Sequence, residues 1–88
     1  MNRERVTILG STGSIGVQTL DIIRRNPDRF QIASLVAHNR WEKLAEQARE
    51  FMAESVVIGD EQYYLPLKEA LADTNIKVMA GSDSIDHV

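Results

Sequence analysis

Four short runs of branched apolar residues alternate with stretches of helical periodicity, and this alternation limits the possible folds more than any other feature. The runs are RVTIL (5–9), QIASLVA (31–37), SVVI (55–58) and IKVMA (76–80). Their near-continuous hydrophobicity is typical of parallel strands that are buried on both faces. Strands that alternate with helices in this way imply right-handed crossovers. The sequence therefore predicts an α/β protein with a parallel sheet in βαβαβαβ order.

The helices between these strands have recognisable ends. The first is expected from Ser14 to about Arg25, because the following Asn-Pro pair disfavours helix. The second is expected over about 40–53, where apolar residues recur at i, i+3, i+4 and i+7. Asn39 and Glu42 have the spacing of a reciprocal cap for this second helix.

The third helix and the end of the chain are less regular. Asp60 is a candidate cap, and Pro66 must either begin the main part of the helix or kink it. The segment GSDSIDHV, residues 81–88, has the pattern of a cap and first turn of a further helix. A four-stranded parallel sheet with so few helices leaves apolar surface uncovered. We therefore expect the domain to be incomplete at the C-terminus.

Composition excludes several classes of function. The chain has 88 residues, a formal net charge of −3 and no cysteine. It therefore holds no disulfide, thiolate zinc site or cysteine nucleophile, and its charge gives no reason to expect a nucleic acid or an anionic membrane as partner. No run approaches the roughly 20 apolar residues of a membrane span, and none suits a signal peptide. We expect a soluble, cytoplasmic protein.

The stretch ILGSTGSIG places Gly10, Gly13 and Gly16 between the first strand and the first helix. The first glycine permits a sharp turn, the second a close approach of backbone to a pyrophosphate, and the third close packing of helix on strand. The N–H groups of the first helical turn favour an anion, and Thr12 and Ser14 can add hydroxyl hydrogen bonds. A turn that binds nothing is the alternative, but the strand before and the helix after it favour a dinucleotide site in a Rossmann-like fold.

The end of the second strand indicates which dinucleotide binds. NAD sites usually have an acidic residue there, which holds the ribose 2′-OH. This sequence has VAHNR instead, with no acidic residue between Phe30 and Trp41. Arg40 is suited to a 2′-phosphate, and His38 and Asn39 are its polar neighbours. NADP(H) is therefore favoured, while a solvated arginine in the first helical turn is the alternative for Arg40.

Candidates for catalysis are scarce. His87 is most simply a solvated residue, and Asp83 and Asp86 suit the compensation of a helix dipole better than a metal site. No metal site, nucleophile or general base is apparent in these residues. We expect the catalytic part to lie outside this chain.

Residues 7–37 closely resemble the N-terminus of the 1-deoxy-D-xylulose 5-phosphate reductoisomerase family. That family joins G-S-T-G-S-I-G to T-L-D, an arginine, N-P and a phenylalanine. The same pattern occurs here at Gly10–Gly16, Thr19–Asp21, Arg24, Asn26–Pro27 and Phe30. Later segments match more loosely but in the same order, so the resemblance covers essentially all 88 residues.

The resemblance implies an NADPH-dependent oxidoreductase of the non-mevalonate isoprenoid pathway. Such enzymes isomerise and reduce 1-deoxy-D-xylulose 5-phosphate to 2-C-methyl-D-erythritol 4-phosphate with Mg²⁺ or Mn²⁺, and they are generally homodimers. The family's cofactor loop maps onto Thr12, Gly13, Ser14 and Ile15. Its second cofactor stretch maps, by position and charge only, onto His38, Asn39 and Arg40. The resemblance places the metal ligands and the residues that bind the phosphorylated sugar beyond Val88.

We therefore expect residues 1–88 to be the N-terminal part of an NADP(H)-binding Rossmann-like domain, inactive alone, with the catalytic and C-terminal domains outside this chain. Two alternatives remain open at this point. One is the NADP-binding part of another reductase, such as an aspartate-semialdehyde dehydrogenase, which carries a catalytic cysteine later in its chain. The other is a non-catalytic nucleotide-binding module.

Overall fold

The computed structural model describes residues 3–81, and its elements follow the predicted alternation. The four strands are β1 (Glu4–Leu9), β2 (Phe30–Ala37), β3 (Ser55–Ile58) and β4 (Lys77–Ala80). The helices are α1 (Ser14–Arg24), α2 (Trp41–Phe51), the short 3-10 helix η1 (Glu61–Tyr63) and α3 (Tyr64–Ala70). The predicted helix after β4 falls on residues 82–88, which lie outside the described part.

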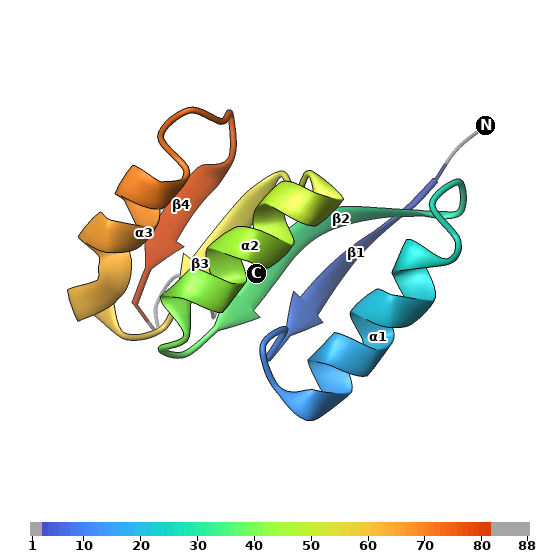
Figure 1. Ribbon diagram of the computed structural model, residues 1–88, viewed down its shortest axis with the longest axis horizontal. Coiled ribbons are helices and arrows are strands. Elements are labelled where there is room, and N and C mark those ends of the chain that lie inside the picture. Colours follow the sequence, from blue (N-terminus) through green and yellow to red (C-terminus); the bar gives the residue numbers. More distant parts are fainter. Residues whose placement is uncertain (1–2, 82–88) are drawn as a thin grey trace.

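The strands form one parallel sheet in the order β1-β2-β3-β4. Each right-handed crossover moves one strand further in the same direction, so α1, α2 and α3 lie together on one face of the sheet (Figure 1). The arrowheads of all four strands point to the same edge (Figure 1). The loops that leave the strands therefore gather at this carboxyl edge. The predicted α/β Rossmann-like fold with βαβαβαβ order is confirmed.

The core lies between the sheet and the three helices. Leu20 of α1, Leu44 of α2 and Leu67 of α3 are each at most 1% exposed, and they pack over strand residues such as Leu35 and Val56. The central strands β2 and β3 are buried along most of their length, as predicted. The edge strand β1 is not, because Leu9 is 67% exposed on the side away from the helices.

Two residues of the family-like pattern join α1 to α2. Arg24 pairs with Asp21 on its own helix and donates two hydrogen bonds to Glu50 on α2. Its guanidinium also lies 5.2 Å from the centre of the Phe51 ring. These contacts hold the two helices side by side at the protein surface. These contacts give Asp21 and Arg24 a structural role in the fold.

The observed helix ends can be compared with the caps and the proline position that the sequence predicts. Asn39 does not cap α2, because the helix begins at Trp41 with Arg40 as its N-cap residue and no side-chain cap. The backbone explains this, since the Trp41 N–H donates to the Asn39 carbonyl and turns the chain before the helix begins. Asp60 caps the separate 3-10 helix η1, through the Gln62 N–H, whereas α3 has Tyr63 as its N-cap residue and no side-chain cap. Pro66 lies inside the first turn of α3, where its missing N–H is tolerated.

Candidate cofactor-binding site

The turn after β1 and the end of β2 lie side by side at the carboxyl edge. The N–H groups of Gly10 and Ser11 both donate to the Val36 carbonyl, at 2.8 and 3.0 Å. The Gly59 N–H, after β3, donates to the Ala37 carbonyl at 2.8 Å. The sheet ladder therefore continues into the loops. It brings the glycine turn next to the segment His38–Arg40, as a single dinucleotide site requires.

The structure gives a different physical reason for the absence of a side chain at each glycine of the turn. Gly10 has φ +70°, a conformation that other residues adopt at a cost. A Cβ on Gly16 would lie 2.3 Å from the Gly10 carbonyl oxygen and 2.7 Å from the Ser11 Cα, so only glycine fits between α1 and the turn. A Cβ on Gly13 would meet the Gly10 oxygen at an ordinary 3.4 Å. Gly13 is therefore not required by packing, and its missing side chain leaves the backbone of this exposed turn open.

The first turn of α1 presents unpaired donors. Its N-cap residue, Gly13, has no side chain to accept a hydrogen bond from the turn. Within residues 3–81, the N–H groups of Ser14, Ile15 and Gly16 have no backbone acceptor, and the ladder of α1 begins with the Val17 N–H to the Gly13 carbonyl. These N–H groups at the positive end of a helix dipole suit a phosphate group.

The side chains around this turn are also available to a ligand. The hydroxyl groups of Thr12 and Ser14 make no hydrogen bond within the described part of the chain, and Ser14 is exposed. Ile15 is 79% exposed, so its side chain is also open to contact. The predicted loop residues are thus brought together in one exposed turn.

The predicted second stretch lies beside a hollow at the N-terminus of α2. His38, Asn39 and Arg40 are all exposed and follow directly after β2. The hollow has a volume of about 410 Å³, and its lining residues are Asn39, Arg40, Trp41, Glu42, Lys43 and Tyr63. Two cations and one carboxylate therefore face it. His38 is near this hollow but does not line it.

Four of the seven described arginines form ion pairs, whereas Arg40, like Arg3 and Arg29, forms none. Arg5, Arg24, Arg25 and Arg49 each form an ion pair with a carboxylate. The Arg40 guanidinium has no ion pair or hydrogen bond among the described residues. An exposed, unpaired guanidinium at the end of β2 is suited to a phosphate.

The nearby carboxylate of Asp60 is already used by the fold. It accepts hydrogen bonds from the Gln62 side chain at 2.9 Å and from the Gln62 N–H at 3.2 Å. These hydrogen bonds, first that of the side chain, hold the pKa of Asp60 below its ordinary value of 3.8, and the charge of His38 adds to them. Asp60 therefore holds the start of η1 and remains ionised.

Ser11, Gln47 and Lys43 were not predicted from the sequence as residues of the site. Ser11 is fully buried, and its carbonyl accepts a 2.9 Å hydrogen bond from the side-chain amide of Gln47 on α2. The signal for Gln47 was its place on α2, since it is a polar residue on the apolar face that includes Leu44 and Ala48. Lys43, beside Arg40, was also missed, because its spacing alone does not distinguish it from a solvated lysine.

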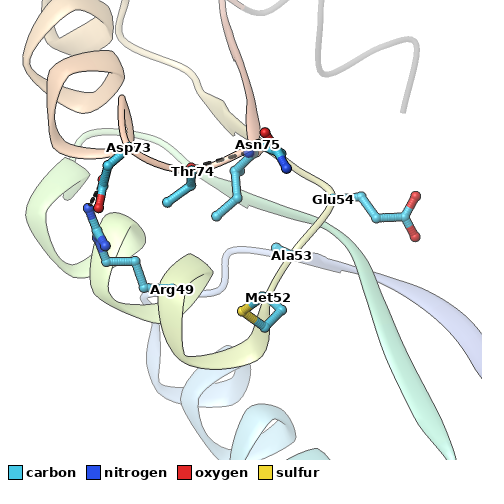
Figure 2. Close-up of a pocket in the computed structure, with 8 residues that line it drawn as sticks. Arg49, Met52, Ala53, Glu54, Asp73, Thr74 and Asn75 are labelled. Atoms are coloured by element: carbon cyan, nitrogen blue, oxygen red, sulfur yellow. Dashed lines mark hydrogen bonds and ion pairs between the residues drawn. The ribbon is translucent and has the colours of Figure 1, made fainter.

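A larger hollow, of about 630 Å³, lies at the opposite, amino edge of the sheet (Figure 2). Its walls are the C-terminal end of α2, the loop before β3 and the loop before β4. The charged groups there pair with one another, since Arg49 donates to Asp73 and to the Ala70 carbonyl, and Glu54 pairs with Arg5. The charged groups that line this hollow are thus already paired within the fold.

Residues 3–81 contain no group of three or more histidine, cysteine or acidic side chains that could hold a metal ion. No helix among these residues is both long and apolar enough to cross a membrane. Within the described chain, the functional candidates are therefore those of the carboxyl edge.

Comparison with known proteins decides the family. The family model of 1-deoxy-D-xylulose 5-phosphate reductoisomerase matches residues 6–88. The chain belongs to this family. The predicted family is therefore confirmed, and the alternative of another NADP-dependent reductase is wrong.

Individual reductoisomerases agree closely with the chain over a limited part of their own length. The protein from Phocaeicola vulgatus is 50% identical over 86 residues, which are 98% of this chain and 22% of that protein. The Porphyromonas gingivalis protein is 52% identical over 83 residues, or 94% of this chain and 22% of the relative. The chain thus spans about a fifth of the length of the curated reductoisomerases that it matches.

Solved reductoisomerase structures share the fold. The Zymomonas mobilis enzyme, solved in complex with NADPH, superposes with a TM-score of 0.95 at 43% identity, over 98% of this chain and 23% of that chain. A second reductoisomerase, solved with NADPH, fosmidomycin and magnesium, gives a TM-score of 0.86 at 32% identity, over 92% of this chain and 20% of its own. The nearly identical backbone makes the carboxyl edge directly comparable with that of an NADPH-binding enzyme.

Proposed function

We propose that this chain is the NADPH-binding segment of a 1-deoxy-D-xylulose 5-phosphate reductoisomerase. The whole protein would isomerise and reduce 1-deoxy-D-xylulose 5-phosphate to 2-C-methyl-D-erythritol 4-phosphate in the non-mevalonate isoprenoid pathway. The observation that carries the proposal is the juxtaposition at the carboxyl edge. The unpaired N–H groups at the start of α1 lie beside a β2 end that supplies an unpaired Arg40.

The residues present fit the two phosphate-bearing ends of NADPH. The turn from Gly10 to Gly16, with Thr12 and Ser14, would hold the pyrophosphate through N–H and hydroxyl donors, and Ile15 would cover it with an apolar side chain. Arg40 and Asn39 would hold the 2′-phosphate and ribose, with His38 beside them. When bound, NADPH supplies the hydride for the reduction.

The remaining parts of the reaction belong outside these residues. We propose that a divalent ion, Mg²⁺ or Mn²⁺, and the phosphorylated sugar bind to domains beyond residues 1–88, which form the N-terminal part of the NADPH-binding domain. We further propose a homodimeric, cytoplasmic enzyme. The resemblance to the family supports the dimer, and the absence of cysteine fits a reducing compartment.

A segment exchange tests the proposal. This chain replaces the matching 86-residue stretch of the Phocaeicola vulgatus protein, and NADPH oxidation is measured with 1-deoxy-D-xylulose 5-phosphate and Mn²⁺. We expect activity with NADPH, little with NADH, and none from the 88-residue chain alone. The unmodified relative is the positive control.

The result that would overturn the proposal is a chimera that unfolds cooperatively yet neither binds nor oxidises NADPH. A direct binding measurement on the chain itself provides an independent reading. Trp41 is the only tryptophan and lines the hollow beside Arg40, so NADPH should quench its fluorescence. If the folded chain binds NADPH, and the chimera binds NADPH but does not oxidise it, a nucleotide-binding module would be favoured over an enzyme.

A further inference from the structure

One side chain from α2 reaches across the fold to the glycine turn. Gln47 is 8% exposed, and its Nε2 donates a 2.9 Å hydrogen bond to the carbonyl oxygen of Ser11, 36 residues earlier in the sequence. Ser11 itself is fully buried. This is a buried contact between two elements, and it involves backbone of the turn that would hold NADPH.

Burying the Gln47 amide on the apolar face of α2 costs free energy of folding unless its hydrogen bond to Ser11 offsets that cost. The buried face of α2 otherwise consists of Leu44, Ala45 and Ala48. The Oε1 atom of Gln47 has no hydrogen-bond partner within residues 3–81, so the side chain is only half satisfied by the fold. An apolar residue would avoid that cost. It would, however, leave the Ser11 carbonyl without a partner, because no other described group donates to it.

The hydrogen bond determines how one peptide group is oriented. The Ser11 N–H is held by the Val36 carbonyl of β2 at 3.0 Å, and the Ser11 carbonyl is held by Gln47 of α2. The next peptide unit joins the Ser11 carbonyl to the Thr12 N–H. A planar trans peptide points these two groups in opposite directions.

The Thr12 N–H consequently points away from the interior, where Gln47 lies. It has no backbone acceptor among the described residues. It therefore adds to the unpaired N–H groups of Ser14 and Ile15 at the start of α1. A set of donors that converge on an anion works best when the fold orients them before the anion binds.

We propose that Gln47 is a positioning residue for the cofactor: by holding the Ser11 carbonyl, it aims the Thr12 N–H at a phosphate of NADPH. This inference rests on the proposed function of the same turn. Because Gln47 is buried and donates to Ser11, we expect it to act through the turn and not by direct contact with the cofactor. Its effect should therefore appear in the affinity for NADPH and not in the chemical step.

The test uses Gln47→Met in the chimeric enzyme, since methionine keeps the length of the side chain but removes the donor. We expect the KM and Kd for NADPH to rise about tenfold, which is the effect of one lost orienting hydrogen bond. The kcat and the KM for the sugar phosphate should change by less than about twofold, because the interaction is equal in ground and transition states.

Arg49→Met is the matched control. Arg49 lies on the same helix and also donates to a backbone carbonyl, that of Ala70 at 2.7 Å, but far from the glycine turn. It should leave the KM for NADPH within about twofold. If it raises this KM as much as Gln47→Met does, the effect comes from a loosened α2 and the inference is wrong.

Gln47→Glu gives a second readout, because its ability to donate a hydrogen bond depends on pH. Its carboxylate cannot donate to the Ser11 carbonyl, whereas its protonated form can. The ratio of its Kd for NADPH to that of the parent should therefore be larger at high pH and fall towards one as pH decreases. A ratio independent of pH, with Gln47→Met also binding normally, would overturn the inference. If the parent chimera does not bind NADPH, the proposed function fails instead.

Discussion

The hollows at the two edges of the sheet differ in whether the charged groups beside them are already paired. At the amino-edge hollow, Arg49 pairs with Asp73 (Figure 2). Arg49 also donates to the Ala70 carbonyl, and Glu54 pairs with Arg5, so the charged groups that line this hollow already have partners. At the carboxyl edge, the Arg40 guanidinium and the first N–H groups of α1 have no partner within residues 3–81.

This difference, and not the size of a hollow, indicates where a ligand binds. The hollow at the amino edge is larger, about 630 Å³ against about 410 Å³ at the N-terminus of α2. A charged ligand gains most where donors are already free of internal partners, since it breaks no existing contact. In a parallel α/β sheet, ligands also bind outside the carboxyl ends of the strands. Substitutions at the two edges should therefore affect different properties.

The largest effect is expected for Gly16→Ala. Its methyl group would lie 2.3 Å from the Gly10 carbonyl oxygen and 2.7 Å from the Ser11 Cα, so α1 and the backbone of the turn must move apart. We expect a loss of about 3 kcal/mol in the free energy of unfolding, together with loss of NADPH binding. Denaturant unfolding and an NADPH titration of the chimeric enzyme measure both.

Gly13→Ala is the control for Gly16→Ala at the same turn. Its methyl group finds 3.4 Å of room, so we expect a stability close to that of the parent and weaker NADPH binding only. Equal destabilisation by the two variants would show that the glycine spacing serves only the packing of α1. In that case Gly13 would give no support for a ligand at the carboxyl edge.

The next effect concerns charge at the carboxyl edge. Arg40→Gln removes an unpaired cation, so we expect about tenfold weaker binding of NADPH and little change for NADH. Its stability should stay within about 0.5 kcal/mol of the parent, because the side chain is exposed. Parallel titrations with the two nucleotides check this. An equal loss for both would place the side chain away from the 2′-phosphate.

A small increase in stability, in contrast to the losses above, is expected for a substitution at the amino edge. Met52 ends α2 in the left-handed conformation with φ +54°, and its side chain is 78% exposed. Met52→Gly should stabilise the protein by about 0.5 kcal/mol, since the strain relieved exceeds the entropy that glycine adds to the unfolded chain. Thermal unfolding measures it, and NADPH affinity should not change. Destabilisation would mean that the Met52 side chain contributes to the hollow.

The smallest effect is a shift in acid titration. The hydrogen bond from Arg49 holds the pKa of Asp73 below its ordinary value of 3.8. The pair therefore stabilises the fold above that pH, and the contribution disappears as pH falls through the lowered pKa. Arg49→Met should raise the pKa of Asp73, as followed by carboxyl NMR, without changing NADPH affinity. An unchanged titration of Asp73 would show that this pair is not formed at the amino edge.

Local sequence patterns were sufficient for the elements of the fold. All four strands and the start of α1 were predicted within about one residue, because branched apolar runs and glycine turns are short-range signals. The cap of α2 was predicted wrongly, because the Asn39–Glu42 spacing does not reveal how the chain leaves β2. The hydrogen bond from the Trp41 N–H to the Asn39 carbonyl is formed in the folded turn.

The sequence by itself determined the parallel α/β order, the glycine turn and the family, since these follow from residue types at fixed spacings along the chain. Only the tertiary structure decided which polar groups remain unpaired at each edge. It also showed that Gln47 holds Ser11 and that Gly16 has no room for a side chain. The physical reason is that these contacts join α1, α2 and the ends of the strands. Their distances depend on how the helices pack on the sheet and not on the spacing of residues.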